Sequence, residues 1–436
     1  MDRRRFESSP IGHLVPIRGV DGRTGKAYDH IAYVADPLTD EPELSSSTWR
    51  AVNAANRALA RLDQASRQIP SPELLRRPTL RREAQSTSAL EGTFAPLEQV
   101  LAADIQDGAL SAELLEIFNY IDAANLAFEE VRQRRRISKG LLESSHGVLV
   151  HGTQADTVDA GRIRRGPVAI GSPTGTIEGA RFVPMPPGTA LEVSVQDLLD
   201  WIATAPSARE PIVAAAMAHY QFETLHPFND GNGRIGRLMV VLQFMADDLL
   251  TEPLLSVSPW FEARRPDYQE HLATVSATGS WDAWIQFFAA GIESSSNDIA
   301  RRVDRLLSVQ ARYIELVQTI PRGRTVRDII DILIGDPIVT VPMLARRLEK
   351  SQPAINTALG QLVDLGVVRG PIGSYNRRFL AEDMWTAITA PVGGVPDRDE
   401  PLARETAETS DPNTPVMLPG LDGEVFDPSE SPSTQT

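Results

Sequence analysis

Apolar side chains recur along most of the chain at three- and four-residue steps, which predicts a mainly helical protein. The first clear stripe, the buried face of an amphipathic helix, consists of Trp49, Val52, Ala55, Leu59 and Leu62. The same pattern predicts further helices over 111–133, 138–150, 192–204, 208–225, 234–250 and 281–319. Residues 1–43 are interrupted by Pro, Gly and Asp, so an irregular lead-in is expected there.

Two segments depart from this simple pattern. In residues 166–188, two short apolar runs flank a Gly/Thr/Pro connection, which predicts a β-hairpin. The segment 69–92 contains Pro78, which predicts a loop and two short helices, the second over 78–92 with Gly92 just after its end.

The C-terminal part has a different organisation. "TVRDIIDILIG", "TVPMLARRLEKS" and "QPAINTALGQLVDLGVV" predict three helices, and "RGPIGSYNRRFL" predicts a hairpin after them. This order is typical of a winged helix-turn-helix. The final residues are rich in Pro, Ser, Thr and acids, so we expect disorder there. The expected division is an N-terminal arm (1–44), a helical region (45–135), a central core (136–290), a linker helix (291–320), a winged helix-turn-helix (321–390) and an acidic tail (391–436).

The charge is distributed unevenly. The net charge is −15, but residues 391–436 hold ten acids against two arginines and account for −8 of it. Residues 321–380 hold nine basic and five acidic residues, a net +4. Gln352, Asn356 and Thr357 open the third predicted helix, and Arg377 and Arg378 would lie on the wing, where phosphates are contacted. DNA binding through 341–378 is one interpretation; dimerisation or protein docking by a winged helix is the other.

The absence of cysteine excludes disulfides, zinc–thiolate sites and thiol catalysis. The basic N-terminus is followed by no apolar signal region, and no apolar run is long enough for a membrane span. We therefore expect a soluble, cytoplasmic protein.

The strongest candidate site is "HPFNDGNGRIGR", His226 to Arg237. The two glycines of "DGNG" can take φ > 0, so successive backbone N–H groups can converge on an anion at the start of the next helix, expected at Arg234. Arg234 and Arg237 lie on one face of that helix and suit phosphate oxygens. Asp230 suits Mg²⁺, and His226 suits proton transfer.

Each of these features also has an ordinary structural interpretation. "DGNG" alone is usually a turn, a single histidine is usually a structural hydrogen-bonding group, and two arginines three apart are usually solvated. The motif lacks the GK[ST] ending of a P-loop and the preceding strand of a Rossmann fingerprint. We favour a phosphate site because acid, glycines, helix start and arginines converge on one small volume.

The same twelve residues resemble the signature of the Fic family, H-x-F-x-[D/E]-G-N-G-R-x-x-R, at every fixed position. Residues 161–188 resemble the Fic flap that precedes the motif, and the resemblance covers about 45–290. It implies a mainly α fold: a Fic helical core with a β-hairpin flap, and a small C-terminal winged-helix domain as a common addition.

The resemblance also implies an activity, the transfer of AMP from ATP to a Ser, Thr or Tyr hydroxyl on a target protein or on the chain itself. His226 would be the base and Asp230 would hold Mg²⁺. Phe228 would anchor the loop. The phosphates would be bound by Gly231, Asn232, Gly233, Arg234, Gly236 and Arg237, with Asn232 at the α-phosphate. The target would pair with the flap over 168–183, while Tyr268 is the recognisable position of a loosely matched adenine pocket.

"TSALEG", Thr87 to Gly92, is by pattern a helix end with a glutamate that the helix dipole disfavours. A solvated glutamate is the ordinary interpretation. The string is also similar to the inhibitory signature of the family, [S/T]-x-x-x-E-[G/N]. This implies that Glu91 pairs with Arg237 and competes with the γ-phosphate.

Several alternatives stay open at this point. The same site could remove AMP or transfer another phosphate-containing group, and Glu91 could orient a water for that purpose. The chain could instead be a DNA-binding regulator whose Fic core is a ligand sensor. A homodimer is neither predicted nor excluded.

Overall fold

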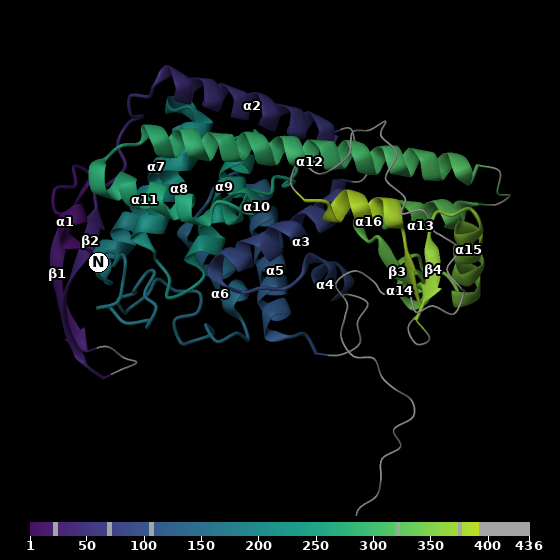
Figure 1. The fold of residues 1–436 in the computed structure, drawn as a ribbon, viewed down its shortest axis with the longest axis horizontal. Coiled ribbons are helices and arrows are strands. Elements are labelled where there is room, and N and C mark those ends of the chain that lie inside the picture. The colour runs from purple at the N-terminus through teal and green to yellow at the C-terminus, as the bar shows by residue number, and fades with distance from the viewer. Residues whose placement is uncertain are drawn as a thin grey trace, which may run out of the picture.

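The computed structural model describes residues 1–20, 25–67, 72–103, 109–318, 320, 323–373 and 377–391, so nearly all of the predicted acidic tail lies outside the described residues. The protein is mainly helical, as predicted (Figure 1). Within the described residues, no helix is both long and apolar enough to cross a membrane. The helices are α1 (Arg3–Phe6), α2 (Ser46–Arg67), α3 (Pro72–Glu91), α4 (Leu97–Ala102), α5 (Ala112–Arg134), α6 (Lys139–Val150), α7 (Thr189–Ala208), α8 (Pro211–Leu225), α9 (Asn232–Ala246), α10 (Ser258–Glu262), α11 (Arg265–Thr278), α12 (Asp282–Leu316), α13 (Arg324–Gly335), α14 (Val341–Arg347), α15 (Gln352–Asp364) and α16 (Glu382–Thr389).

The centre of the core is the pair α8 and α9, which precede and follow the loop over 226–231, the motif loop. Nearly every residue of both helices is buried, including Arg234 and Arg237 of α9, as expected for helices at the centre of a core. α5, α6 and α7 pack around this pair. The motif loop is therefore held between two immobilised helix ends, which favours a precisely shaped site.

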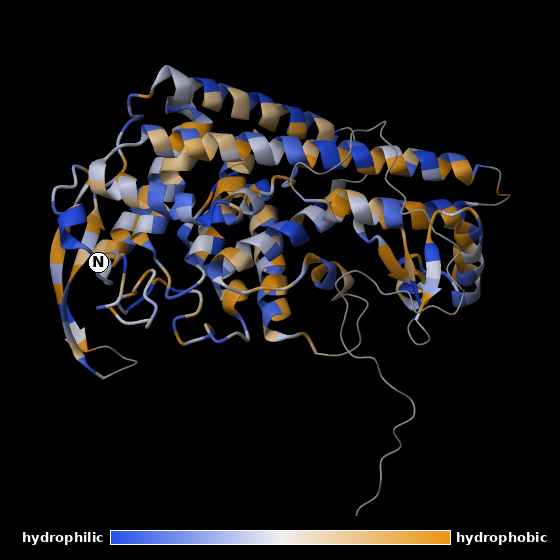
Figure 2. Cartoon of the chain, in the orientation of Figure 1, coloured by the Kyte–Doolittle hydropathy of each residue, from blue (hydrophilic) through white to orange (hydrophobic). Residues whose placement is uncertain are grey.

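Two long amphipathic helices cover one side of the core. α2 lies along α12, and hydrophobic and hydrophilic residues alternate along both (Figure 2). α12 has 35 residues, about 50 Å at 1.5 Å per residue, and runs without interruption from the core to the C-terminal helices (Figure 1). The expected boundary between core and linker helix at residue 290 therefore falls inside a single helix.

The N-terminal residues are more regular than predicted. After α1, strands β1 (Gly12–Val20) and β2 (Ala27–Ala35) form an antiparallel hairpin. The prediction of an irregular lead-in over 1–43 is wrong here, since proline is tolerated in an edge strand and Pro16 lies in the outer strand β1. Tyr33 of β2 is fully buried, and its N–H donates to the carbonyl of Val183 at 2.8 Å.

The two short helices predicted over 69–92 are one helix, α3, with Pro78 inside it. Proline frees the carbonyl four residues earlier, that of Leu74. This oxygen faces Gly335 of α13, where a Cβ would lie only 2.7 Å away. A glycine on a distant helix thus accommodates the irregular turn, so the predicted interruption at Pro78 does not occur.

The flap forms with little regular structure. Ile170 and Phe182 make one antiparallel bridge, and the rest of 166–188 consists of turns and extended residues. Ile177, Ala180 and Val183 are buried against the side chains of β1 and β2. The N-terminal hairpin therefore supports the flap from one side.

The C-terminal helices α13, α14 and α15 lie within the three predicted segments. A short strand β3 (Ile338–Thr340) precedes α14, and β4 (Arg369–Ile372) and β5 (Arg378–Leu380) complete a sheet of order β3-β5-β4. On α15, Ile355, Leu359 and Leu362 are buried. Gln352, Asn356 and Thr357 are exposed at its N-terminal half.

Candidate functional site

The motif loop opens into a cavity of about 590 Å³. α3, α8, α9, α11, the flap and α1 all contribute to its walls. Its polar lining includes Glu91, Glu223, His226, Arg237 and Tyr268. The structure therefore brings the predicted base, one predicted phosphate-binding arginine and the predicted inhibitory glutamate into one space.

His226 ends α8 in a left-handed conformation, with φ 50°, that is unusual for a residue with a side chain. Its N–H donates to the Phe222 carbonyl at 2.9 Å. Its Nδ1 lies 3.2 Å from the carbonyl of Glu223. Because a carbonyl can only accept, Nδ1 carries the proton and Nε2 keeps a free lone pair. This is the tautomer that a general base requires.

Charge also favours a neutral ring. Burial, followed by the positive charge of Arg164, lowers the pKa of His226 to about 4, against smaller opposing effects of the Glu223 carbonyl, Glu91 and Asp230. At neutral pH the imidazole is therefore neutral, and Nε2 is ready to accept a proton.

A second histidine, His146 of α6, contacts the motif loop, and the sequence did not point to it. Its ring stacks on Phe228, with centroids 4.1 Å apart. Nδ1 accepts the N–H of Gly161 at 2.9 Å, so Nε2 is the donor to the Asp230 carbonyl at 3.1 Å. Burial lowers the pKa of His146 to about 4, so it stays neutral. His146 thereby fixes the backbone that presents Asp230.

The two motif glycines have different tasks, which corrects the expectation that both adopt φ > 0. Gly231 does so, with φ 73°, at the N-cap of α9. The helix begins at Asn232 rather than at Arg234, so Gly233 lies in its first turn. A Cβ on Gly233 would lie 2.0 Å from Oε1 of Glu91. Gly233 is therefore needed for space, because the carboxylate lies directly over it.

Asn232 braces the loop with its side chain. Its Oδ1 accepts the N–H of Phe228 at 2.8 Å, and its Nδ2 donates to the Phe228 carbonyl, also at 2.8 Å. The side chain has one amide hydrogen left for the predicted contact with an α-phosphate. The backbone N–H groups at the start of α9 are the other donors directed to the same place.

Asp230 lies at the edge of the site with a 58% exposed side chain. Oδ1 accepts the N–H of Gly231 at 2.6 Å. Within the described residues, no cluster of three or more His, Asp or Glu suited to a metal ion is present. A single exposed carboxylate does fit Mg²⁺ bound jointly with nucleotide phosphates, since this ion commonly uses one or two carboxylates and phosphate oxygens.

Arg234 is 4% exposed and points to a partner that the sequence did not identify. Its NH1 lies 3.2 Å from Oε2 of Glu116 on α5, and this oxygen also accepts the hydroxyl of Thr93 at 2.8 Å. No local pattern marks Glu116, which is one of several acids on an ordinary helix. The pair holds the Arg234 side chain beside Asp230, 3.7 Å away.

Arg237 is fully buried and held at the end of α3. Its Nε donates to Oγ1 of Thr87 at 2.8 Å, and its NH2 donates to the Thr87 carbonyl at 3.1 Å and to Oε1 of Glu91 at 2.6 Å. Burial opposes ionisation of Glu91, but the charge and hydrogen bond of Arg237 outweigh it, so the pKa of Glu91 is lowered. The guanidinium also offsets the negative end of the α3 dipole. Gly92 follows in a left-handed conformation, φ 101°, and ends the helix.

α3 is attached at three levels along its length. Near the site, Thr87 and Glu91 hold Arg237. One turn earlier, the buried carboxylate of Glu83 accepts the hydroxyl of Ser256 at 2.8 Å and the N–H of Ser258 at 3.0 Å. Farther back, Arg77 and Arg81 pair with the buried Asp336, and Arg82 donates to the carbonyls of Ile388 and Ala390. The helix that contacts Arg237 is thus also bound to the C-terminal helices.

Tyr268 and Gly236, both predicted to contact the nucleotide, differ in their position relative to the cavity. Tyr268 lines the cavity, and its hydroxyl donates to His219 Nε2 at 2.8 Å, since the Nδ1 of that ring donates to the Gly236 carbonyl. Gly236 lies outside the cavity lining. A Cβ there would lie 2.5 Å from Oε1 of Glu223 and 3.1 Å from the Phe222 ring, so this glycine allows α8 and α9 to pack closely.

Glu223 is an unpredicted carboxylate in the cavity. Its Oε1 is buried without a hydrogen-bond partner, and burial raises the pKa of Glu223 to about 7, helped by Glu91 and opposed by Arg237. The folded state therefore keeps the proton between the ordinary pKa of the group and about 7. In this range the unfolded chain has already lost the proton, so the free energy of unfolding falls as the pH rises and stays lowered above about pH 7.

The Glu223→Gln variant is expected to melt a few degrees above the parent at pH 8, where the parent carboxyl is ionised. The gain should nearly vanish at pH 5, where the parent group is protonated in the folded state. Thermal unfolding followed by circular dichroism at both pH values measures this. Glu73→Gln, at an exposed site on α3, is the control, and an equal gain at both pH values would contradict the explanation.

Residues 49–129 match the family described as Fic/DOC family N-terminal, and residues 136–244 match the Fic/DOC family. The second match contains the flap, the whole motif and all but the last two residues of α9. Over residues 49–129 and 136–244 the chain therefore matches Fic/DOC domains, as the motif predicted.

Individual relatives extend the comparison. Protein adenylyltransferase fic-1 of Caenorhabditis elegans is 40% identical over 92 residues, 21% of this chain and 16% of that protein. Protein adenylyltransferase Fic of Drosophila willistoni is 31% identical over 157 residues, 35% of this chain and 29% of that protein. The chain thus matches less than a third of the length of these relatives. A Fic family protein from Desulfovibrio desulfuricans G20 shares the fold over 79% of this chain and 98% of its own, with TM-score 0.50 and 22% identity.

Proposed function

We propose that this protein is a protein adenylyltransferase that moves AMP from ATP to a hydroxyl side chain of a target protein, and to itself, and that it is autoinhibited. The observation that carries the proposal is the position of His226. Its unprotonated Nε2 faces the same cavity as the N-terminus of α9 and Arg237. The family membership and the names of the relatives support it.

The reaction needs one proton transfer and one displacement. The target hydroxyl loses its proton to Nε2 of His226 as its oxygen attacks the α-phosphorus. The bond from that phosphorus to the bridging oxygen of the β-phosphate breaks, and pyrophosphate leaves. Backbone N–H groups at the start of α9 would stabilise the charge that develops on the α-phosphate.

Asp230 would hold Mg²⁺ against the phosphates, and the ion would neutralise charge on the leaving pyrophosphate. Arg234 and Arg237 would bind the β- and γ-phosphates through their planar guanidinium groups. Tyr268 would lie at the adenine. These assignments use each charged group of the motif once.

The inhibitory contact supports the second half of the proposal. Glu91 Oε1 lies 2.6 Å from Arg237 and directly over Gly233, the two places where phosphate oxygens would bind. An anion already occupies the anion site, so ATP would have to displace it or bind in another pose. The same carboxylate could instead orient a water for AMP removal, and the two uses give opposite products.

The test is intact-mass and peptide mass spectrometry after incubation with Mg²⁺-ATP, alone and with a lysate. We expect the added mass of one AMP on a Ser, Thr or Tyr, and a larger fraction of modified protein when Glu91 is replaced. Loss of AMP from a pre-modified lysate would favour removal as the main reaction. No change in either assay, with the Glu91 variant folded, would remove the enzyme proposal.

The flap would guide the target, with one restriction. β2 already pairs with the flap, since Tyr33 contacts Val183 and Pro184. A target segment would therefore have to add at the other edge, along residues 168–171. This narrows the expected docking segment of 168–183 to its first part.

The C-terminal residues support a second candidate function, DNA binding by a winged helix-turn-helix. α15 presents Gln352, Asn356 and Thr357 to solvent, and Arg377 is exposed beside β5. The positive charge available for DNA phosphates is smaller than the sequence suggested, because Arg369 pairs with Glu382 at 2.7 Å and Arg347 pairs with Asp336. α3 would connect the two functions, because it contacts both Arg237 and Asp336.

A gel-shift series with a labelled duplex tests this candidate. We expect binding that weakens steeply as salt rises, and Arg377→Ala is expected to weaken it about threefold to tenfold while reducing the salt dependence by about one phosphate contact. Arg369→Ala, which removes an arginine already paired with Glu382, is the matched control with a smaller effect. Absence of a shift at low salt would favour protein docking instead.

A further inference from the structure

Arg164 is a buried arginine that the proposed reaction does not use. It lies in the loop between α6 and the flap and is 1% exposed. Its Nε donates to the carbonyl of His226 at 2.8 Å, and its NH2 donates to that of Leu225 at 3.4 Å. Its backbone N–H donates to the carbonyl of Pro227 at 2.8 Å. Three consecutive carbonyls around the base are thus held by one residue.

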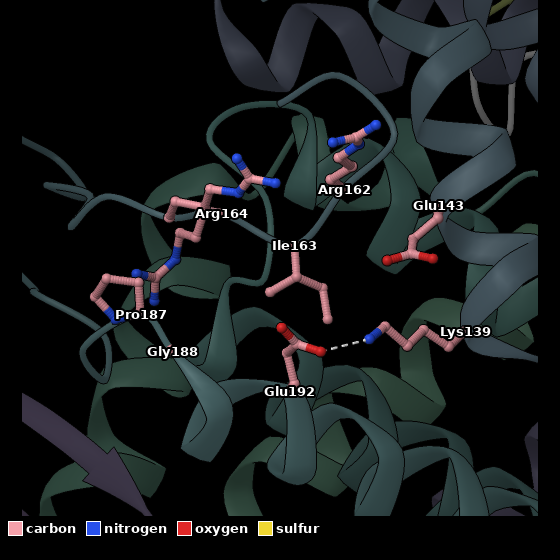
Figure 3. A pocket seen from close by; sticks show the side chains of 9 residues that line it. Lys139, Glu143, Arg162, Ile163, Arg164, Pro187, Gly188 and Glu192 are labelled. Carbon is pink, nitrogen blue, oxygen red and sulfur yellow. Dashed lines mark hydrogen bonds and ion pairs between the residues drawn. The ribbon is translucent and has the colours of Figure 1, made fainter. Parts of the chain in front are cut away.

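The same guanidinium also binds both sides of the flap. NH1 donates to the carbonyl of Gly166 at 3.0 Å, and NH2 donates to that of Met185 at 2.6 Å. Arg164 forms part of the wall of a separate cavity of about 320 Å³, across which Lys139 and Glu192 form an ion pair at 2.9 Å (Figure 3). Arg164 therefore joins the flap to the end of α8.

The partners of this guanidinium are backbone carbonyls, not carboxylates. Carbonyl dipoles at the C-terminal end of a helix stabilise a cation without cancelling its charge. Burial lowers the pKa of Arg164 to about 10, which leaves the group charged at neutral pH. A permanent positive charge is thus fixed close to His226.

We propose that Arg164 is a positioning residue for His226, which fixes the left-handed backbone of the base, ties it to the flap and disfavours a second positive charge on its ring. Only the expected effect of Arg164 on turnover rests on the proposed function. The left-handed turn at His226 needs such support, because a non-glycine residue with φ > 0 is strained unless its surroundings determine it. A base and a flap held by one guanidinium would keep the docked hydroxyl and Nε2 in register.

Titratable and charged groups surround the ring on several elements. The charges of Arg164 in the loop, Glu91 of α3 and Asp230 of the motif loop act on it. The cavity wall also holds the amino group of Met1 and the side chains of Asp2, Arg5, Arg181, Glu223, Arg237, Arg265 and Tyr268. The carboxylates favour an imidazolium and the arginines oppose it. Removing the charge of Arg164 is therefore expected to move the protonation midpoint of His226 upward.

The experiment is a ¹H–¹³C titration of the histidine rings by NMR, with His226 assigned by the missing signal of His226→Ala. In the parent protein we expect a His226 midpoint well below 6. Arg164→Gln, which keeps hydrogen-bond donors but not the charge, should raise it by about half a unit or more. Arg164→Lys should keep the midpoint but lower the kcat of AMP transfer in the Glu91→Gly background about tenfold or more. Arg162→Gln and Arg165→Gln, at neighbouring exposed arginines, should change neither.

A parent midpoint near 6.5 would overturn the inference. So would a folded Arg164→Gln variant with parental midpoint and turnover. If Arg164→Gln does not fold, the Lys variant decides, since parental turnover there would contradict a positioning role. The titration requires no AMP transfer, so a shifted midpoint in a protein without transferase activity would remove the proposed function and leave this inference standing.

Discussion

Replacing Glu91 by glycine is expected to raise AMP incorporation at least tenfold. The carboxylate pairs with Arg237 at 2.6 Å and lies over Gly233, so its removal frees a guanidinium and the space above the first turn of α9. Displacing a competitor that costs about 1.4 kcal/mol already gives a factor of ten. Thr87 would still hold Arg237 through its hydroxyl and carbonyl, so the arginine would be only partly released.

The measurement is the initial rate of transfer of labelled AMP with Mg²⁺-ATP, to the protein itself and to a lysate. Glu73→Gly is the matched control, since it introduces the same change at an exposed site on the same helix. Equal labelling of the Glu91 variant and the parent, with ATP binding demonstrated for both, would show that the carboxylate does not inhibit the reaction.

His226→Ala is expected to abolish AMP transfer while leaving ATP binding intact. A positioned general base contributes about 10²–10⁴-fold, and His226 is the only imidazole among the described residues that line the cavity. The variant should be compared in the Glu91→Gly background, where the parental rate is high enough to measure the loss. Because the pKa of His226 is lowered to about 4, activity of the unsubstituted site should fall only below about pH 5.

The control for this variant is His13→Ala, at an exposed position on β1. It should keep the full rate. If His226→Ala lost ATP binding to the same extent as AMP transfer, the substitution would have disrupted the motif loop and not only removed the base. Transfer at the parental rate would assign the base to another group.

Local pattern was sufficient for most of the helices. α5, α6 and α8 lie within a few residues of the predicted spans, because each has a long apolar stripe and a clear end signal. α3 was not predicted as one helix, since the contact that accommodates Pro78 comes from Gly335, far away in sequence. The hairpin β1–β2 does have a local signal in the sequence, the Asp21-Gly22 pair between two alternating segments.

The residues of the candidate site could likewise be predicted only in part from the sequence. The motif identified the groups with a chemical task, and the structure brings His226, Arg237 and Glu91 together. The residues that hold these groups in place, His146 and Arg164 among them, carry no motif that states their role. Their contacts are mostly with backbone atoms, which any sequence provides, so only the three-dimensional arrangement reveals them.

The order of the chain gives the contact between α3 and Arg237 a consequence for synthesis. A ribosome makes proteins from the N-terminus, and segments made first can fold first. Glu91 precedes Arg237 by 146 residues, so the carboxylate is present before the guanidinium leaves the ribosome. Under the proposed autoinhibition, a newly made copy would complete its phosphate site with Glu91 already present, and would have no interval in which to modify its neighbours.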